Sequence, residues 1–345
     1  MHKDPGHHLL ESIKKELREL YGEGFNLFDG THHARYFKPG VPYHIISRAF
    51  QGRYLLRPSK RVNAIIAGVV GRALNENKGV TLYAQVFMSN HLHMMLAGDP
   101  TSIVGFMRDV KREVSCRLAK LPHLKWSGTM WHGPYLATGL PTHESQIKCL
   151  RYILSHGVKE GLVARPEQWP GIHSAKELLS GKKLKGSWFW STPYGKKLNA
   201  QNRTKKKKSV RQRDFYITYE IELKTIPAWQ HLDAKEVRQR IREMVKDIVE
   251  EGRKARRGKK PLGAKAVCKM PVSTVSELPD PPWFEDRKAM VCWPSTDREG
   301  TWTYVEAFYL FQSAFRRAAG KLKQGLLDVV FPSGSFRPGL ATATT

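Results

Sequence analysis

Two histidines set two residues apart are the first candidates for chemistry in this chain. His91 and His93 lie in a short apolar segment that runs from Met88 to Asp99. Successive side chains of a strand point to opposite faces, so both imidazoles would project together while Leu92 enters a core. Two imidazoles on one face can share a metal ion, but they leave coordination positions for another side chain, water or substrate. A metal site therefore requires a third ligand. Without one, the pair is typical of polar residues on a half-solvated strand face.

A second candidate lies farther along the chain, between residues 142 and 162. Apolar residues recur there at helical spacing behind Thr142, which is a plausible N-cap, and predict one amphipathic helix over most of this stretch. At roughly 100° per residue, Tyr152 and His156 fall side by side on the face opposite the apolar stripe, together with Lys148 and Lys159. This face brings a tyrosine, a histidine and two lysines together.

The polar helix face supports two interpretations. In one, Tyr152 is a nucleophile and His156 is the third ligand of an ion held by His91 and His93. Phosphate chemistry suits these groups, because a divalent ion polarises a phosphoryl oxygen while a phenolate attacks phosphorus. In the other, the helix face is simply solvated and happens to carry a tyrosine. Helical spacing alone does not separate them.

The elements that must position these residues form a recognisable order from Tyr43 to Leu162. Strands and helices alternate in a way that gives an antiparallel sheet with helices packed against it, an α+β fold. The expected strands are Tyr43 to Phe50, Thr81 to Val86, His91 to Ala97 and Tyr135 to Leu140, and the expected helices between them are Ser59 to Glu76 and Ile103 to Leu121.

Four motifs in this order resemble the single-tyrosine HUH transposases of the IS200-like superfamily, and within them the REP-associated tyrosine transposases. Asn90 to His93 matches the His-hydrophobic-His motif after an apolar strand, and the later helix carries Tyr152. Arg35 to Arg48 is similar to the family's opening strand, and Trp131 to Tyr135 to the start of the strand before its tyrosine helix.

The resemblance implies a ferredoxin-like or RNA-recognition-motif-like core, with His91, His93 and His156 as ligands of Mg²⁺ or Mn²⁺ and Tyr152 as nucleophile. The chain departs from the family at two positions. Related sequences usually carry Gln or Asn at the position of His156, often followed by Pro, and Ser89 stands where Pro is common.

The activity implied by the resemblance is metal-dependent cutting and rejoining of single-stranded DNA. Tyr152 would attack a backbone phosphate to give a 5′-phosphotyrosine and a free 3′-hydroxyl, and a second 3′-hydroxyl would reverse the step. The ester preserves the free energy of the phosphodiester, so no nucleotide cofactor is expected. The expected partners are single-stranded or hairpin DNA and a second copy of the chain, since relatives can exchange the tyrosine helix within a homodimer.

The charge of the chain independently favours a polyanionic partner. Of its 345 residues, 58 are Lys or Arg and 31 are Asp or Glu, which gives a formal net charge of +27. Nucleic acid is favoured over a membrane because no apolar run approaches roughly 20 residues. No targeting segment is apparent, so we expect a cytoplasmic protein associated with a bacterial nucleoid.

The candidate DNA contacts are cations and two tryptophans. Asn202 to Lys208 is expected to be a flexible basic linker. Lys182 to Trp190 mixes cations with aromatic rings as a base-stacking groove would. The alternative for the two tryptophans is that they pack beneath the core. The candidates are Arg35, Lys38, Arg48, Arg108, Lys111, Arg112, Lys148, Lys159, Trp188, Trp190, Lys205, Lys206, Lys207 and Lys208.

Composition divides the chain into four expected segments. These are an N-terminal helical arm over 1–34, the HUH nuclease domain over 35–178, a basic aromatic linker over 179–212 and a basic, mainly helical extension over 213–345 for DNA binding or dimerisation. The extension contains an alternating strand from Phe215 to Leu223, a capping box of Asp233 and Glu236, and a last helix from Tyr304 to about Leu327.

Two other classes of function also fit the sequence. One is a domesticated relative that holds hairpin DNA or RNA through its basic surface and does not cut it. The other is a metal-dependent hydrolase in which the three histidines activate water and no covalent intermediate forms.

Overall fold

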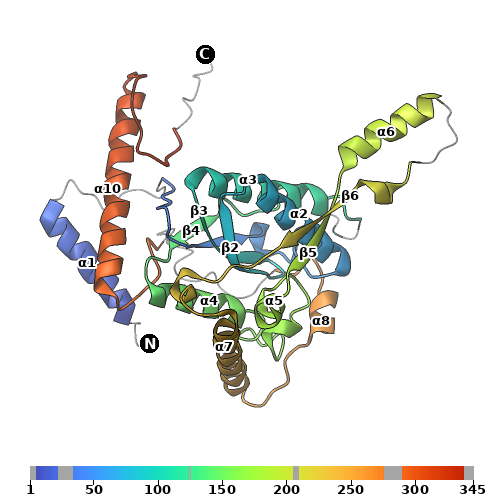
Figure 1. Cartoon of the computed structure of the whole chain (residues 1–345), viewed down its shortest axis with the longest axis horizontal. Coiled ribbons are helices and arrows are strands. Elements are labelled where there is room, and N and C mark those ends of the chain that lie inside the picture. Colours follow the sequence, from blue (N-terminus) through green and yellow to red (C-terminus); the bar gives the residue numbers. More distant parts are fainter. Residues whose placement is uncertain are drawn as a thin grey trace.

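A four-stranded antiparallel sheet lies at the centre of the molecule (Figure 1). The structure is a computed structural model that describes residues 5–21, 34–122, 124, 126–204, 210–275 and 290–337. The strands lie in the order β2-β3-β1-β4, with helix α2 after β1 and helix α3 after β3. This arrangement is the ferredoxin-like core, so the predicted α+β class is confirmed. The bounds are β1 Tyr43–Arg48, α2 Lys60–Glu76, β2 Val80–Phe87, β3 His91–Gly98, α3 Pro100–Leu118 and β4 Leu136–Gly139.

The helix starts follow local hydrogen-bond chemistry. Ser59 caps α2 by accepting a hydrogen bond from the backbone N–H of Val62 at 3.1 Å. Asp99 caps α3 by accepting from Ser102, and Pro100 occupies the first turn, where its missing N–H costs nothing. α3 therefore begins before the expected Ile103, because the cap rather than the first apolar residue sets its start.

The two faces of the sheet pack against different helices. On one face, Tyr43, Ile45 and Leu92 join a core cluster with apolar residues of α2 and α3. The opposite face packs on helix α4, His143–Ser155, through a second core cluster that includes Met95. Because side chains alternate along a strand, His93 and its cross-strand partner Ile46 project to this second face.

The segment expected to be a linker contains ordered structure that packs on the core. Helix α5 spans Ala175–Ser180, β5 spans Leu184–Phe189, α6 spans Ser191–Thr204 and β6 spans Tyr216–Ile221. β5 pairs antiparallel with β6, and both strands contact α2. A Cβ built on Gly186 would lie 2.1 Å from the carbonyl oxygen of Ala67, so the β5 and α2 backbones are in direct contact. The alternating strand predicted in the extension is confirmed as β6, whereas α6 extends away from the body (Figure 1).

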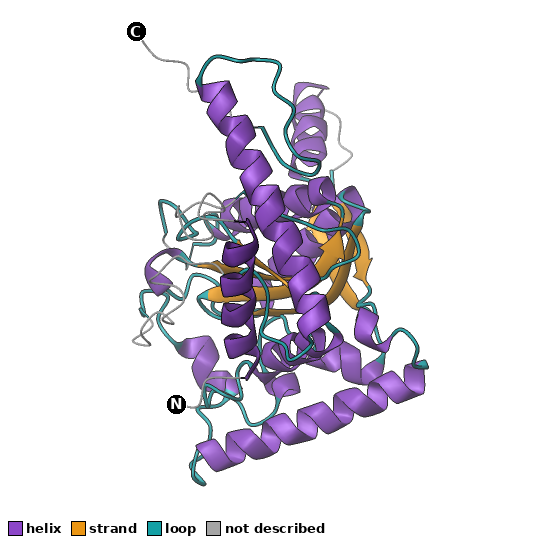
Figure 2. Cartoon of the chain, turned by 90° about the vertical axis from the view of Figure 1, so that its left-hand side faces the viewer, coloured by secondary structure: helices purple, strands orange, loops and turns teal. Residues whose placement is uncertain are grey.

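The two ends of the described chain also meet. Helix α1, Pro5–Tyr21, lies beside helix α10, Arg298–Lys323, in both views (Figures 1 and 2). Leu10, Ile13 and Leu17 of α1 belong to the same core cluster as Tyr304 of α10. The arm and the extension therefore share a core with the predicted nuclease domain.

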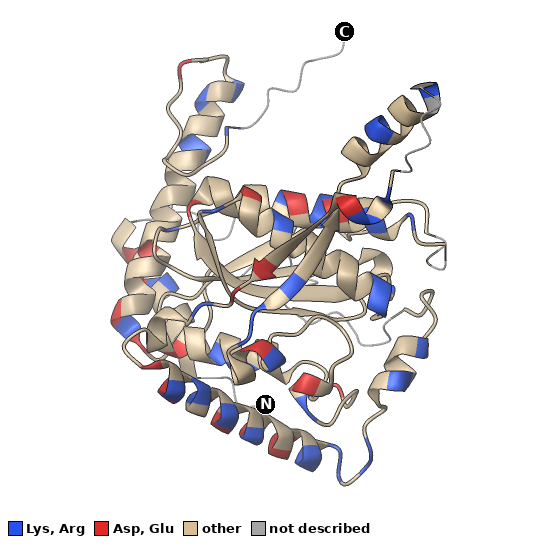
Figure 3. Cartoon of the chain, turned by 45° about the vertical axis from the view of Figure 1, so that its right-hand side comes forward, with Lys and Arg blue, Asp and Glu red and all other residues tan. Residues whose placement is uncertain are grey.

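The remaining helices lie below the α4 side of the sheet in Figure 1. Helix α7 spans Ala234–Ala255, and α8 spans Ala264–Lys269. The predicted capping box is confirmed, because Asp233 accepts from the backbone of Glu236 and the Glu236 carboxylate accepts from the Asp233 N–H. Basic and acidic residues are interleaved on the outer side of α7 (Figure 3). Among the described helices, none is long and apolar enough to cross a membrane.

Candidate functional site

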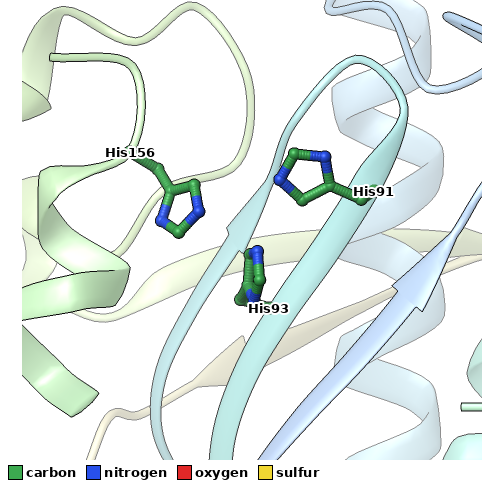
Figure 4. Close-up of side chains that lie close together, drawn as sticks. All are labelled: His91, His93 and His156. Atoms are coloured by element: carbon green, nitrogen blue, oxygen red, sulfur yellow. The ribbon is translucent and has the colours of Figure 1, made fainter. Parts of the chain in front are cut away.

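Strand β3 presents His91 and His93 on the face of the sheet that packs against α4. His93 is 2% exposed and pairs with Ile46 of β1, and His91 pairs with Arg48 at the end of the same ladder. The register fixes both imidazoles on one face, as the spacing of the two histidines predicted. Figure 4 shows their rings on β3, facing His156 across a short gap.

Helix α4 ends one residue before His156, earlier than the predicted helix. Its start is fixed by a capping box between Thr142 and Ser145. Its end is fixed at Gly157, which takes a left-handed φ of +85° and donates its N–H to the Glu160 carboxylate at 2.6 Å. The expectation of one helix continuing past His156 is therefore wrong. The C-cap position still keeps the His156 ring beside Tyr152, with ring centroids 4.7 Å apart.

Three imidazoles converge at this point from two elements. Nitrogen atoms of His91, His93 and His156 all lie within 4.8 Å of one another. The Nδ1 of His91 lies 2.7 Å from the Oδ1 of Asn90, and the Nδ1 of His156 lies 2.9 Å from the carbonyl oxygen of Tyr152. Donation from each Nδ1 leaves the Nε2 lone pair free, which is the usual arrangement of a metal-ligating histidine.

The protonation of these histidines suits metal binding. Burial, with Lys159 and Arg48 nearby, lowers the pKa of His91 to about 3. Burial also lowers the pKa values of His93 and His156 well below the ordinary value. All three are neutral near pH 7, and neutral imidazole is the ligand form. The donor set thus fits a divalent ion with further positions left for water or substrate oxygens.

Two residues of this site were not found by sequence reasoning. The Nε2 of His44 lies 2.9 Å from the Nδ1 of His93, and the indole Nε1 of Trp293 donates to the Nδ1 of His44 at 3.1 Å. His44 lies in the predicted first strand, and its register opposite Met95 would have indicated the histidine face. Nothing in the local sequence indicates Trp293, because it reaches the sheet from far along the chain.

Tyr152 lies directly beside the three histidines. Its ring centroid is 5.4 Å from that of His93. Burial, then the nearby Glu160 and Cys149, raises the pKa of the Tyr152 phenol to about 12. The ammonium group of Lys159 lies 3.7 Å from the centroid of the Tyr152 ring and 3.6 Å from a Glu160 oxygen. The nucleophile candidate thus has a cation against its ring.

The predicted DNA contacts are divided between several surfaces. Arg48 lies on β1 and Lys148 on α4, and Lys148 also pairs with Glu144 at 2.9 Å. Lys159 follows α4 and contacts the ring of Tyr152. The three candidates on α3 lie on the helix that covers the opposite face of the sheet, so the structure does not bring them to Tyr152. These are Arg108 and Arg112, which pair with Asp109, and Lys111, which donates to the carbonyl of Gly133 at 2.6 Å.

The other predicted contacts that the structure describes have partners other than the histidines. Arg35 stacks over the ring of Tyr135 at 4.3 Å, and the Lys38 backbone N–H donates to the Tyr43 hydroxyl. Trp190 is half-buried at the end of β5. Lys205, Lys206, Lys207 and Lys208 lie outside the described residues.

Trp188 requires a correction. It is 4% exposed, and the guanidinium groups of Arg72 and Arg117 lie 4.2 Å and 3.3 Å from its ring centroid. A base could not reach this ring, because stacking requires an accessible face. Trp188 packs against the core, and the prediction that it stacks on a DNA base is wrong.

The ferredoxin-like sheet and the three-histidine cluster lie within one segment of the chain that a family model matches. The family model described as "Transposase IS200 like" matches residues 40–156 of this chain. No curated protein matches the chain.

Two solved structures are similar to parts of the chain. One is a REP-associated tyrosine transposase bound to a REP hairpin, with 14% identity, a TM-score of 0.34, and coverage of 43% of this chain and 85% of the other. The second is a putative transposase from Deinococcus radiodurans R1, with 22% identity, a TM-score of 0.26, and coverage of 35% of this chain and 95% of the other.

Proposed function

We propose that this protein is a transposase that nicks and rejoins single-stranded DNA through a phosphotyrosine formed on Tyr152. The observation that carries the proposal is the placement of the Tyr152 ring against a cluster of three neutral imidazoles, 4.7 Å from His156 and 5.4 Å from His93. The net charge of +27 supports a DNA substrate. Hairpin-bearing single strands are the proposed substrate class, and a homodimer is the proposed assembly.

The histidines would hold a divalent ion, Mg²⁺ or Mn²⁺, that polarises the scissile phosphate. His91, His93 and His156 fit this role because all three are neutral and their nitrogen atoms converge within 4.8 Å. Asn90 and the Tyr152 carbonyl orient two of the rings through Nδ1. Two of the three candidate ligands, His91 and His156, are therefore oriented before substrate arrives.

The chain's own residues supply the remaining parts of the reaction. The Tyr152 oxygen attacks phosphorus, the P–O3′ bond breaks, and the 3′-oxygen leaves and takes up a proton. The Tyr152 phenol gives its proton to solvent water during attack, and solvent returns a proton to the leaving 3′-oxygen. The adjacent Lys159 ammonium stabilises the negative charge of the phosphate and of the developing phenolate. Arg48 and Lys159 bind backbone phosphates and position the strand.

The test is covalent capture of DNA by the protein. Wild-type protein and the Tyr152→Phe variant are incubated with 3′-labelled single strands from the DNA flanking the gene, in Mg²⁺ or Mn²⁺. We expect label to migrate with denatured wild-type protein and not with the variant. Tyr216→Phe is the matched control, since Tyr216 is 50% exposed on β6 and should form the adduct normally. An adduct on Tyr152→Phe would refute the assignment of the nucleophile.

A hydrolase is a second candidate because the third ligand is a histidine. Three imidazoles with an open position form the ligand set of enzymes that activate metal-bound water. In that case His91, His93 and His156 suffice, and Tyr152 is dispensable. Metal-dependent cutting by both wild type and Tyr152→Phe without an adduct would establish the hydrolase. Binding of hairpin strands without any cutting would instead indicate a domesticated binding module.

A further inference from the structure

A pocket of about 130 Å³ is lined in part by Tyr152 and by none of the three clustered histidines. Its floor is the sheet face formed by β1 and β4, and its walls are aromatic and apolar. The lining residues are His44, Ile46, Leu136, Thr138, Tyr152, Met290 and Trp293.

The C-terminal extension closes this pocket through a short sheet-like contact. The Trp293 N–H donates to the Gly139 carbonyl at 2.9 Å, and Gly139 donates to Val291 at 3.3 Å. Cys292 forms a parallel bridge with Gly139 at the edge of β4. Met290 and Trp293 thereby become fixed parts of the wall, although they lie outside the segment matched by the family model.

The chemistry of the walls fits a flat aromatic ring. The rings of Tyr152 and Trp293 meet edge to face with centroids 5.4 Å apart, and each offers a π surface. Ile46 and Leu136 offer aliphatic contacts. The hydroxyl of Thr138 is the polar group of the β4 floor and can bond to the edge of a base. A cavity of about 150 Å³ holds one benzene ring in an engineered protein, so this volume suits a single ring better than a fused pair.

We propose that this pocket binds one pyrimidine base of the substrate strand, next to the scissile phosphate. The position follows from Tyr152, which is shared between the pocket wall and the histidine site. Stacking of the base on one of the two rings, Tyr152 or Trp293, fixes the strand's register, and the small volume excludes purines. The inference rests on the proposed function only for the identity of the scissile phosphate, since base binding needs no cleavage.

The proposal is tested by photochemical cross-linking, which does not depend on cutting. Single-stranded dT12 carrying 5-iodouracil is irradiated with the full-length protein, and the cross-linked peptides are mapped by mass spectrometry. We expect cross-links at Trp293, Met290 or Tyr152. The variant Thr138→Leu fills the pocket from β4 and should abolish these cross-links, whereas Thr303→Leu, at an exposed position of α10, should leave them unchanged.

The preference for dT12 over dA12 gives a second test, because a substitution at a purely structural residue would not change this preference. Wild type should bind fluorescein-labelled dT12 about tenfold more tightly than dA12, the size of a stacking contribution from one base. Met290→Ala enlarges the pocket and should bring the two affinities within about twofold. Equal affinities of wild type for dT12 and dA12, or a ratio that Met290→Ala leaves unchanged, would overturn the proposal.

The same samples separate this proposal from the proposed function. A Tyr152 adduct on flanking DNA with no cross-link at the pocket would leave the transposase mechanism standing and refute the base pocket. Pocket cross-links with no adduct on any flanking strand would support the base pocket and refute the covalent mechanism.

Discussion

The Nε2 of His44 lies 2.9 Å from the Nδ1 of His93, and this contact sets the proton on a candidate metal ligand. The indole N–H of Trp293 can only donate, so the Nδ1 of His44 accepts and its Nε2 carries the proton. His44 then donates to His93, which leaves the proton of neutral His93 on Nε2. A ligating nitrogen must be unprotonated, so the hydrogen bond from Trp293 holds His93 in the tautomer that does not bind metal through Nε2.

Replacing Trp293 with Phe should therefore tighten metal binding. The substitution removes the indole donor, so His44 can take its proton on Nδ1 and accept from His93. One hydrogen bond is worth about 0.5–1.5 kcal/mol, which corresponds to roughly a twofold to tenfold gain in Mn²⁺ affinity by calorimetry. Trp190→Phe is the control, because the Trp190 indole nitrogen has no partner within the described chain. Weaker Mn²⁺ binding by Trp293→Phe would show that the tautomer argument is wrong.

His156 should decide which metal the site prefers. Three imidazoles suit Mn²⁺ better than Mg²⁺, since Mg²⁺ prefers oxygen ligands. His156→Gln supplies an amide oxygen at the same position and should shift the preference toward Mg²⁺, whereas His156→Ala should weaken Mn²⁺ binding by about 10- to 100-fold. Titration of each variant with both ions measures this. An unchanged Mn²⁺ affinity in His156→Ala would exclude His156 as a ligand.

The core of the fold was predictable because periodicity and capping act locally. Alternation around His93 predicted β3 and its two faces, and the ferredoxin-like order followed from the sequence of strands and helices. The proximity of Tyr152 and His156 was also predicted, although the helix ends before His156. Tyr152 and His156, four residues apart, remain neighbours because the C-cap residue still follows directly on the last helical turn.

The rest depended on contacts between distant segments, which no local pattern encodes. Trp293 reaches His44 because residues near 292 add to the edge of β4, and neither segment signals the other. Trp188 lies in a segment as basic as a DNA-binding loop, yet its burial is set by Arg72 and Arg117 on separate helices. Composition identified the charge but could not assign each cation to a surface.

The rate of adduct formation should rise with pH across the neutral range. Burial, Glu160 and Cys149 raise the pKa of Tyr152 to about 12, so the attacking phenolate is a minor species near pH 7. Its fraction grows about tenfold per pH unit below that pKa, and the neutral histidines do not counter the trend because their pKa values are lowered. Single-turnover rates from pH 6 to pH 9 should increase without a plateau. A flat profile would mean that another step limits the reaction.

Glu144 should make the protein's stability depend on acid pH. Burial raises its pKa, but hydrogen bonds from Lys148, Thr296 and Ser295 outweigh this and lower it to about 2. A lowered folded-state pKa gives stability that is present above the ordinary value of 4.5 and is lost as pH falls toward 2. After allowance for solvent screening, the contribution is about 1–2 kcal/mol.

The variant Glu144→Gln tests this contribution directly. Chemical denaturation at pH 7 should show a loss of about 1–2 kcal/mol relative to wild type, and at pH 3 the difference should shrink. Glu243→Gln on α7 is the control, because its carboxylate accepts from the neutral amide of Gln239. A Glu144→Gln deficit that stayed constant with pH would rule out a charge effect.

Gly186→Ala should destabilise the whole protein, because β5 packs on α2 and is not a linker. The added Cβ would lie 2.1 Å from the Ala67 carbonyl oxygen, so the hairpin must move away from the core. Such overpacking costs about 1–3 kcal/mol. Gly195→Ala in α6 is the matched control, since a Cβ there meets nothing within 4 Å and alanine favours a helix by about 0.5–1 kcal/mol. Thermal unfolding should show a lower Tm for the first variant and an equal or higher Tm for the second. If both variants unfolded like wild type, residues 179–212 would behave as the linker that composition suggested.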